Sequence, residues 1–468
     1  MANELEKKPF YEKFIKKTEN KKESALNGNK TKKISEKKEG FNKTKTETPE
    51  FIAKIKNEKK SIFTPLDDKT MNLLNSFGII VKKALLLNSK QEALIPKDIR
   101  RLFHELTDER SSRKVNYLNN PVKLTAYIYH YMWWNLVRIS KLISNMEFDL
   151  QDGNIIADFG SGPLTLACAF WIAKPELRKK RLHWYCADIS GKALSAGESI
   201  FKSLCEFTEK DKDIPYAPWQ ITKVTGSFGT PLKTDMDFFV SANMFNEIFW
   251  DSSAKIDGEA KKAVNTVLRY LNKKGAALII EPGIPLAGEF ISELRKNFLE
   301  KKFYVETPCP HNGICPIPGT KLYLPENKNM PIAFDKWCHF SFYTDEAPLN
   351  LVKISETANL EKSRASLSFI YCKAPNKTID KREESVYRQN LKDSDGLTAR
   401  ITSDIIKLRD GKIGRYACSE KGFLLLTEKN SFKAKLKTYQ DGTLVKIHTE
   451  KTKQLPHDKK TGAAVINI

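Results

Sequence analysis

The most reactive side chains of this chain gather in the stretch from Thr307 to Phe342. That stretch holds three cysteines and two histidines: Cys309, Cys315, Cys338, His311 and His339. Cys309 and Cys315 are each followed by proline, which fixes the backbone and removes a donor, so both sulfurs are expected on stiff turns. Thiolates presented in this way are typical of a metal site. The spacing therefore predicts that all three cysteines are metal ligands.

A fourth ligand must come from another part of the chain. Cys372 lies in the alternating apolar segment SLSFIYC and has the pattern of a packed core thiol, whereas Cys418 precedes a turn and could fold back onto the loop. We therefore expect Cys418 to complete the site. Four thiolates suit zinc or an iron–sulfur cluster, and His311 or His339 in the fourth position would favour zinc. The other three cysteines have apolar or helical contexts typical of core residues: Cys168, Cys186 and Cys205.

A second constellation begins at the apolar run Ile155–Ala157, which leads into Asp158, two glycines and a helical pattern. This order predicts the strand, tight turn and helix of a nucleotide-binding unit. Glycines let a ligand approach the backbone, and the following helix N-terminus favours negative charge. A second apolar segment, HWYCADIS, ends at Asp188. Its separation in sequence from the glycines is somewhat longer than the roughly 20 residues at which a carboxylate follows to bind a ribose diol.

The turn sequence GSGPLT resembles the first motif of class I S-adenosylmethionine-dependent methyltransferases rather than the dinucleotide pattern GxGxxG. The resemblance implies a cofactor site made of these residues: Asp158, Gly160, Ser161, Gly162, Asp188 and Ser227. Asp158 and the glycine turn would hold the methionine and ribose parts, Asp188 would hold the ribose hydroxyls, and Ser227 lies at the turn where this family meets the adenine.

Four polar residues fall at the ends of two later predicted strands: Asn243, Asn246, Glu247 and Glu281. They are candidates for ligand contacts, and we assign Asn243 and Glu247 to the cofactor site; helix or loop capping explains each equally well. The Asn/Asp-Pro-Pro-aromatic tetrapeptide of base-amine methyltransferases is absent from the sequence. Cys309 in TPCP could serve as a thiolate nucleophile, but its spacing to the other cysteines favours a ligand. No catalytic residue is identified.

The elements that position these residues predict an α/β fold. Residues 1–62 contain 18 Lys against 10 Glu and are expected to be a disordered tail. Apolar residues at helical spacing predict a helical domain at 63–148. Strands alternating with helices predict a parallel, Rossmann-like class I methyltransferase core at 149–375, which includes the metal loop. Short alternating segments and the turn QDGT predict a basic β-rich domain at 376–468.

Charge indicates an anionic partner, because 79 Lys and Arg against 57 Asp and Glu give a net charge of +22. The lysine tail suits sequence-independent contact with nucleic-acid phosphates, or solubility alone. Five basic residues precede Cys418 and could face RNA phosphates or simply solvent: Arg400, Lys407, Arg409, Lys412 and Arg415. Five aromatic residues could stack on bases, although core packing is the more common role of such a stripe: Tyr127, Tyr129, Tyr131, Trp133 and Trp134.

The combined pattern of GSGPLT, EPG, PCPHNGICP, WCHFSF and a basic β-rich end resembles the methyltransferase-like assembly factors of the small ribosomal subunit, found in bacteria and mitochondria. The resemblance implies contact with small-subunit rRNA and ribosomal proteins, a four-iron, four-sulfur cluster, and an S-adenosylmethionine pocket of debated activity. The implied cluster ligands are Cys309, Cys315, Cys338 and Cys418. The long insertion before Cys418 and the lysine tail depart from the family pattern.

The function expected from the sequence is therefore rRNA binding in small-subunit assembly, with methyl transfer to rRNA as its enzymatic version. The alternative is an iron–sulfur redox or iron sensor that binds nucleic acid without catalysis. The sequence has neither an apolar run of the roughly 18 to 20 residues that span a bilayer nor a signal-peptide layout. We expect a monomeric, cytoplasmic protein that does not contact membranes.

Overall fold

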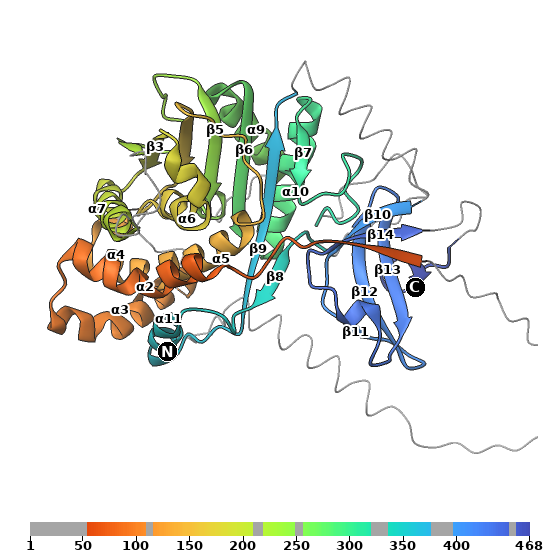
Figure 1. Ribbon diagram of the computed structural model, residues 1–468. Helices are drawn as coiled ribbons and strands as arrows, with labels where there is room; N and C mark the ends of the chain where they lie inside the picture. The colour runs from red at the N-terminus through yellow and green to blue at the C-terminus, as the bar shows by residue number, and fades with distance from the viewer. Residues whose placement is uncertain are drawn as a thin grey trace, which may run out of the picture.

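The computed structural model describes residues 54–108, 116–208, 219–248, 256–319, 336–375, 396–448 and 455–468. Two sheets organise these residues, one of eight strands and one of seven. In Figure 1 the first sheet, with its helices, forms an α/β body, and the second forms a β body beside it. The cysteine-rich loop lies between β7 and β8 of the first body.

The first sheet contains β2 (Ile155–Phe159), β3 (His183–Asp188), β4 (Gln220–Thr225), β5 (Met236–Ala242), β6 (Leu271–Pro282), β7 (Tyr304–Thr307), β8 (Phe340–Tyr343) and β9 (Arg364–Lys373). Its order is β4-β3-β2-β5-β6-β9-β7, with β8 also paired to β9. The first five strands are parallel, and β9 runs antiparallel to its neighbours. The predicted class I methyltransferase fold is confirmed. Strand order reverses between β2 and β5, the position at which such sheets bind ligands.

The helices are α2 (Asp68–Leu85), α3 (Ser89–Thr107), α4 (Pro121–Tyr127), α5 (Trp133–Ile143), α6 (Thr165–Ala173), α7 (Gly191–Thr208), α8 (Phe245–Ile248), α9 (Ile256–Tyr270), α10 (Pro285–Glu300) and α11 (Leu349–Thr357). Alternate strand residues face opposite layers. Ile156 packs in one core with α2 to α7 and α11, whereas Ala157 packs in the other with α9 and α10. The sheet is therefore covered on both faces.

The helices before β2 pack onto the sheet, whereas the sequence predicted a separate helical domain at 63–148. A single hydrophobic core runs from Ile62 through these helices to Tyr371 of β9. The aromatic stripe is mostly part of that core. Trp133 donates its indole N–H to the Leu74 carbonyl at 2.9 Å, and Trp134 donates to the Ser355 hydroxyl at 3.0 Å. These helices form one layer of the α/β body.

The second sheet contains β1 (Lys54–Lys60), β10 (Gly396–Ile401), β11 (Ile406–Lys407), β12 (Lys412–Ser419), β13 (Gly422–Lys429), β14 (Leu444–His448) and β15 (Ala464–Asn467). Its order is β1-β14-β10-β12-β13-β15, with β11 beside β12. The predicted tail at 1–62 extends too far, because Lys54–Lys60 pair with β14 as an edge strand. Residues 1–53 lie outside the described part of the chain. The C-terminal β body therefore takes one strand from near the other end of the sequence.

Across the described ranges, no single helix is long and apolar enough to cross a membrane. Helices α2 and α3 together reach the required length and composition, but the chain bends by 119° between them.

The contact between α7 and the glycine turn gives a first prediction. A Cβ at Gly197 would lie 2.4 Å from the carbonyl carbon of Pro163, a backbone atom that cannot rotate away. We expect Gly197→Ala to lower the free energy of unfolding by about 1 to 3 kcal/mol, measured by urea denaturation. Gly258→Ala in α9 is the matched control, because a Cβ there meets nothing within 4 Å. Equal urea midpoints for the two variants would contradict the predicted contact.

Candidate functional site

The glycine turn connects β2 to α6 through three residues in the left-handed region, with φ of +69° at Gly160, +51° at Gly162 and +57° at Leu164. The N–H groups of Gly160 and Ser161 donate to the Ala187 carbonyl at 2.9 and 3.1 Å. A Cβ at Gly160 would lie 2.5 Å from Cβ of Met244, so glycine is required where the turn passes the segment after β5. The turn thus brings bare backbone to the point where strand order reverses.

Asp158 stands at the start of this turn and is 1% exposed. Its Oδ2 accepts a hydrogen bond from the Ser161 hydroxyl at 2.6 Å, and its Oδ1 has no partner among the described residues. Burial raises the pKa of Asp158 to about 7, against the opposing effect of the Ser161 hydrogen bond. A buried carboxylate oxygen without a partner fits a ligand that brings a donor, such as the ammonium group of S-adenosylmethionine.

This pKa gives a second prediction. A cationic ligand binds the ionised form of Asp158. Below the Asp158 pKa of about 7 the carboxyl is protonated in the free protein, so it must lose its proton before the ligand binds. We therefore expect S-adenosylmethionine affinity to fall by roughly tenfold per pH unit below 7 and to level off above it. Calorimetry in two buffers of different ionisation enthalpy should show proton release at pH 6.5. Affinity that does not change between pH 6 and 8 would contradict a role for Asp158 in binding.

Asp188 supports the turn from the end of β3. Its Oδ2 accepts from the Gly162 N–H at 2.9 Å, and its Oδ1 accepts from the Ser190 N–H at 2.8 Å. Burial raises its pKa, while these two backbone bonds oppose the shift. The Asp188 carbonyl also accepts from the Gly226 N–H at 3.0 Å, which places the exposed Ser227 beside the same strand end. Asp188 and Ser227 thus both lie near the turn. A ribose bound to Asp188 would share its carboxylate with the N–H groups of Gly162 and Ser190.

A small cavity joins four of the predicted residues to five others: Tyr127, Asn135, Asp158, Gly160, Ser161, Thr165, Leu166, Ala242 and Asn243. Its volume is about 10 Å³, room for about one water molecule. Gly162, Asp188, Ser227 and Glu247 do not line it. A nucleoside-sized ligand would therefore have to displace side chains of the helical layer, of which Tyr127 is the largest in the lining. Tyr127 and Asn135 were not predicted as cofactor contacts, because their helical spacing is typical of core.

A buried arginine from α5 connects the helical layer to the strand ends. Arg138 donates to Oδ1 of Asn243 at 2.7 Å and to the Ser366 carbonyl at 2.9 Å. Glu281 accepts from the N–H groups of Phe245 and Asn246, each at 3.0 Å. Burial raises the pKa of Glu281 to about 8, although Arg138 opposes the shift. Asn243 and Glu281 thus hold the segment after β5 in place, in the supporting role that the sequence left open.

Glu247 lies at the edge of this region, in α8. Its Oε1 is 3.5 Å from the Tyr117 hydroxyl, and its charge raises the pKa of Tyr127, although burial of that tyrosine is the larger cause. Asp188 has the same effect on Tyr127. Glu247 and Asp188 therefore approach the cavity from the side of Tyr127, rather than forming its wall.

The four predicted metal-ligand cysteines come together where the α/β and β bodies meet. Cys309 and Cys315 lie in the loop after β7, Cys338 precedes β8, and Cys418 lies in β12. Burial raises the pKa of Cys338, and the neighbouring sulfurs of the other three cysteines raise it further. Cys315 and Cys338 also pack against the same small hydrophobic cluster. The fourth predicted cysteine is thus a spatial neighbour of the first three, whereas Cys372 is fully buried in β9 and its sulfur lies 3.8 Å from the Ala277 carbonyl oxygen.

Two buried arginines bring positive charge to these sulfurs. Arg295 of α10 donates Nε–H to Sγ of Cys309 at 3.2 Å and Nη2–H to the His311 carbonyl at 2.9 Å. Burial opposes its charge, yet the adjacent cysteines keep its pKa above the ordinary value. Burial lowers the pKa of Arg400 to about 10, although three of the cysteines oppose this shift. Cationic partners of this kind stabilise thiolates.

His311 lies beside the cysteines. Its Nδ1 accepts from the Gly313 N–H at 3.1 Å, and its Nε2 lies 3.7 Å from Sγ of Cys418. Burial, and to a smaller extent the charge of Arg295, lower the pKa of His311 to about 3, so the ring is neutral. With Nδ1 accepting, Nε2 carries the proton and points it towards sulfur. His311 is thus placed to donate to Cys418.

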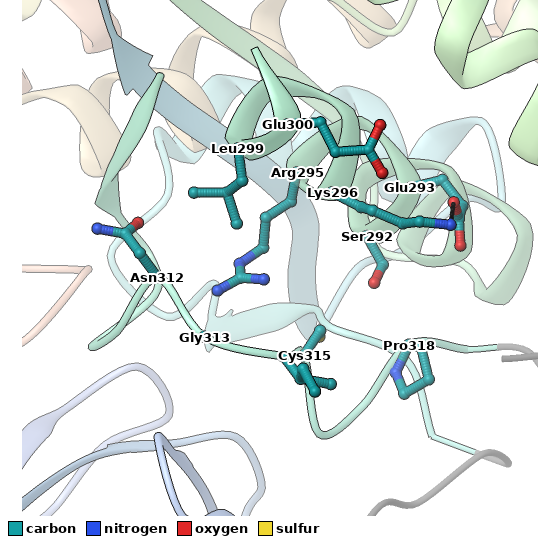
Figure 2. Close-up of a pocket in the computed structure, with 11 residues that line it drawn as sticks. Ser292, Glu293, Arg295, Lys296, Leu299, Glu300, Asn312, Gly313, Cys315 and Pro318 are labelled. Atoms are coloured by element: carbon teal, nitrogen blue, oxygen red, sulfur yellow. Dashed lines mark ion pairs between the residues drawn. The ribbon is translucent and has the colours of Figure 1, made fainter. Parts of the chain in front are cut away.

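Figure 2 shows a cavity of about 370 Å³ beside this group, between α10 and the cysteine loop. Arg295 extends from the helix towards the loop, while Cys315 and Pro318 line the opposite wall. The Ser292 hydroxyl forms a hydrogen bond that lowers the pKa of the Cys315 thiol, although burial raises that pKa more strongly. Cys315 is therefore accessible from this cavity on the α10 side. The cavity shares no lining residue with the small cavity at the glycine turn.

The predicted RNA-facing basic group is only partly on the surface. Arg400 donates to the Pro308 carbonyl at 2.8 Å and to the Gly442 carbonyl at 3.0 Å. Arg415 donates to the carbonyls of Leu436 and Ser403 at 2.9 and 2.7 Å. Both guanidinium groups are buried and hold backbone together, whereas Lys407 and Arg409 are exposed. The prediction was therefore wrong for Arg400 and Arg415, because charge pattern does not reveal burial.

Within the described ranges, no three histidine, cysteine, aspartate or glutamate side chains form a group that could hold one metal ion as they stand. Four thiolates around a single zinc must all lie about 2.3 Å from one point. In an iron–sulfur cluster each thiolate binds a different iron, so the sulfurs lie farther apart. The four cysteines are therefore neighbours, but the side chains of the described residues do not form a metal site as they stand.

A protein-family model described as "Mitochondrial small ribosomal subunit Rsm22" matches residues 153–422. The chain belongs to this family. The match includes the glycine turn and all four cysteines, and it ends before the last strands of the β body. The description names mitochondria, whereas the sequence had led to an expectation of the cytoplasm.

Comparison with solved structures returns methyltransferases at low similarity to this Rsm22-family chain. A Listeria monocytogenes protein assigned to the class I S-adenosylmethionine-dependent methyltransferases has 13% identity and a TM-score of 0.30, covering 66% of this chain and 88% of its own. The precorrin-6y C5,15-methyltransferase of Geobacter metallireducens has 14% identity and a TM-score of 0.22, covering 42% and 79%. No curated protein matches the chain. The fold assignment rests on the strand order and direction described above.

Proposed function

We propose that this protein binds the rRNA of the mitochondrial small ribosomal subunit during its assembly, with a metal cluster joining its two bodies. The observation that carries the proposal is the family match over residues 153–422, which includes both the glycine turn and the four cysteines at the junction. The net charge of +22 supports an RNA partner. The protein acts as a monomer, and its methyltransferase fold provides the scaffold.

The cluster that we propose is a four-iron, four-sulfur cluster held by Cys309, Cys315, Cys338 and Cys418. When bound, it supplies a rigid covalent link between the cysteine loop and β12, together with redox sensitivity. The chain supports it with Arg295 and Arg400, whose buried charges favour thiolates, and with the His311 N–H directed at Cys418. The link would add to the hydrogen bonds that already join the two bodies, such as those from Ser341 to Asp441 and from Arg400 to the Pro308 carbonyl.

Anaerobic purification tests the cluster. We expect a coloured protein with visible absorption and about four iron and four sulfide per chain, the composition of such a cluster. Cys205→Ser, far from the junction in α7, should retain that spectrum. A colourless protein with one zinc would remove the cluster, and with it the alternative of an iron–sulfur sensor. Stoichiometric iron with unchanged RNA affinity in oxidised and reduced protein would favour the structural role over the sensor.

The cofactor that we propose for the glycine turn is S-adenosylmethionine. Asp158 would bind its ammonium group, the Gly160–Gly162 backbone would follow the methionine part, and Asp188 would accept from the ribose hydroxyls. Whether methyl transfer to rRNA follows is a separate question, because we assign no catalytic base or nucleophile. Calorimetry with wild type and Asp158→Ala tests binding: we expect a loss of at least tenfold in the variant. No detectable binding by the wild-type protein would eliminate the enzymatic version and leave the scaffold.

A further inference from the structure

A cavity of about 510 Å³ lies between the two bodies, apart from both the glycine turn and the α10 cavity. Its walls come from the segments around β8 and β9 on one side and β10 to β14 on the other. The residues that line it are Gly283, Ile317, Lys336, Trp337, His339, Ser341, Arg364, Ser366, Thr402, Ser403, Asp404, Ile406, Tyr416, Phe423 and Asp441. This volume falls in the range of small-ligand sites.

Each body contributes a stacked aromatic pair to this cavity. Trp337 and His339 have ring centroids 5.0 Å apart at 22°, and Tyr416 and Phe423 have centroids 5.0 Å apart at 12°. Trp337 is fixed in place, because its indole N–H donates to the Gly283 carbonyl at 3.1 Å and a Cβ at Gly288 would lie 2.6 Å from its ring. A planar ligand would therefore meet prepositioned ring surfaces, at little cost in side-chain entropy.

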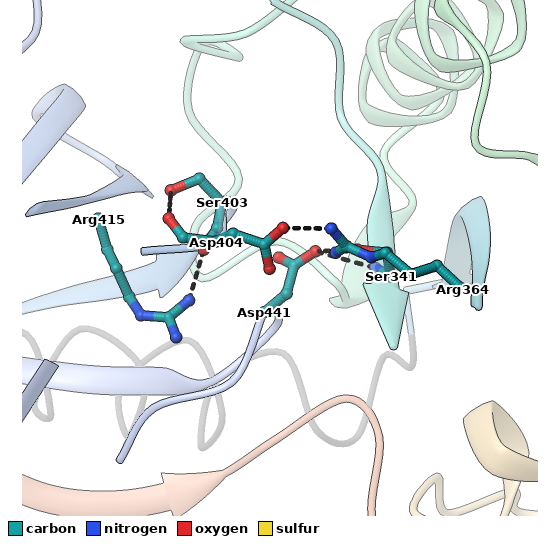
Figure 3. Close-up of polar contacts among 6 residues, drawn as sticks. All are labelled: Ser341, Arg364, Ser403, Asp404, Arg415 and Asp441. Atoms are coloured by element: carbon teal, nitrogen blue, oxygen red, sulfur yellow. Dashed lines mark hydrogen bonds and ion pairs between the residues drawn. The ribbon is translucent and has the colours of Figure 1, made fainter. Parts of the chain in front are cut away.

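The polar wall of the cavity contains acceptors that the described residues leave unused. Asp441 is 6% exposed, and its Oδ2 accepts from the Ser341 N–H at 2.9 Å and from the Ser341 hydroxyl at 3.2 Å. Its Oδ1 has no partner in the described part of the chain, and neither does Oγ1 of Thr402. Figure 3 shows Asp441 beside the Arg364–Asp404 ion pair, with Ser341 on the strand opposite. A buried acceptor without a partner is costly unless a ligand supplies a donor.

The charges of the wall limit which ligand fits. Asp404 and Asp441 are balanced by Arg364 and Lys336, so the wall attracts neither a bare cation nor a bare anion strongly. Arg364 also lies over the Tyr343 ring, 5.1 Å from its centroid, at the rim. A neutral planar ring with N–H donors, carrying a phosphate that can reach Arg364 or Lys336, matches every element of this wall.

We propose that this interdomain cavity binds a nucleobase that carries an amino group, stacked on its aromatic residues and donating N–H to Asp441. Uracil is disfavoured, because its only ring N–H lies between two carbonyl oxygens that a carboxylate repels. The base comes either from a free nucleotide or from unstacked single-stranded RNA, and the RNA source rests on the function proposed above. Purines and cytosine present an exocyclic amino group on the edge that Asp441 would read.

Quenching of tryptophan fluorescence on the cluster-loaded protein tests this site, with oligouridine decamers carrying one central adenine, cytosine or guanine as probes. We expect each to bind at least tenfold more tightly than the all-uridine decamer. Asp441→Asn replaces an acceptor with a donor at nearly the same volume and should remove that preference. Asp235→Asn makes the same charge change at an exposed position and should keep it. If Asp441→Asn fails to fold, Gly288→Ala, which crowds Trp337 from outside the cavity, replaces it and should weaken the binding of every decamer at least tenfold; unchanged binding would overturn the inference.

The outcomes separate this inference from the proposed function. Asp441-dependent binding of AMP, CMP or GMP identifies free nucleotides as the source, and binding of decamers alone identifies RNA; both support the site. Binding of rRNA fragments equally by wild type and Asp441→Asn, without base preference, overturns the inference and leaves the proposed function standing. Nucleotide binding without any rRNA binding supports the site and overturns the proposed function. Asp441-dependent binding of an arginine peptide in place of every nucleotide overturns the inference.

Discussion

Cys309→Ser is expected to abolish iron binding, loosen the attachment of the β body and weaken rRNA binding at least tenfold, while changing the S-adenosylmethionine Kd by less than twofold. The variant removes one of four neighbouring sulfurs and the acceptor of the Arg295 Nε–H. A serine hydroxyl can still accept that hydrogen bond, but it is a poor ligand for iron compared with a thiolate. The expected loss is therefore the loss of the cluster and of its link between the bodies.

Limited proteolysis, iron analysis, RNA filter binding and calorimetry on the same preparation would test this expectation. Cys205→Ser is the control, because it changes another incompletely buried thiol in the α/β body. Retained cofactor affinity with lost RNA affinity would mean that the cysteines act as a link between bodies. Equal loss of both affinities would instead indicate a general folding defect or a cluster that belongs to the cofactor site.

Arg138→Met is expected to lower the free energy of unfolding by about 3 kcal/mol and to weaken S-adenosylmethionine binding about tenfold. The guanidinium holds Asn243 and the Ser366 carbonyl, so its loss leaves buried acceptors unpaired and frees the segment after β5. Glu281 would also lose the positive charge that partly opposes its raised pKa. Methionine keeps most of the apolar volume, which separates the polar loss from a cavity effect.

The pH dependence of this variant follows from Glu281. Its pKa in the folded protein, about 8, lies above the ordinary value of 4.5, so its contribution to stability is fully present below 4.5 and is lost as pH rises towards 8. Without Arg138 the pKa of Glu281 should rise further, so the loss should continue to higher pH and be larger in total. Urea denaturation at pH 5 and pH 8 measures this loss of stability. Lys141→Met on the same helix is the control, because Lys141 pairs with the exposed Glu346 and such a pair contributes little to stability. Identical urea midpoints for wild type and Arg138→Met would contradict a supporting role.

The cofactor turn could be predicted from sequence because its constraints are local. An acid, two glycines and a helix start follow a short apolar strand, and each residue is needed where it stands: Gly160 because Met244 leaves no room for a Cβ, and Asp188 because it ends the next strand. The parallel direction of the first five strands followed from the alternation of strands with helices. Local patterns of this kind predict structure well, because the neighbouring residues that determine the fold are also close in the sequence.

The contribution of the helical layer could not be predicted in the same way. Arg138 and Asn243 are 105 residues apart in sequence, and their hydrogen bond depends on how α5 crosses the sheet. Spacing on a helix indicates which face is buried, but it does not tell which buried polar group will meet which strand end. Tyr127 was assigned to core or to base stacking for this reason, although it lines the cofactor cavity.

Charge counts misled the interpretation at two places for a related reason. Arg400 and Arg415 belong to a basic run, yet their guanidinium groups satisfy carbonyls inside the β body and at the junction. Lys54–Lys60 belongs to a lysine-rich segment, yet its backbone completes the sheet edge along β14. In both cases the backbone hydrogen bonds of distant segments decide the outcome, and composition does not report them.

Crosslinking of the protein to RNA in cells, followed by sequencing of the recovered RNA, tests the central claim most directly. The proposal predicts that rRNA of the mitochondrial small subunit dominates the recovered sequences, and that the Cys418→Ser variant recovers much less of it than wild type. Recovery of RNA that is not ribosomal, or equal recovery of small-subunit rRNA by wild type and Cys418→Ser, would contradict the account.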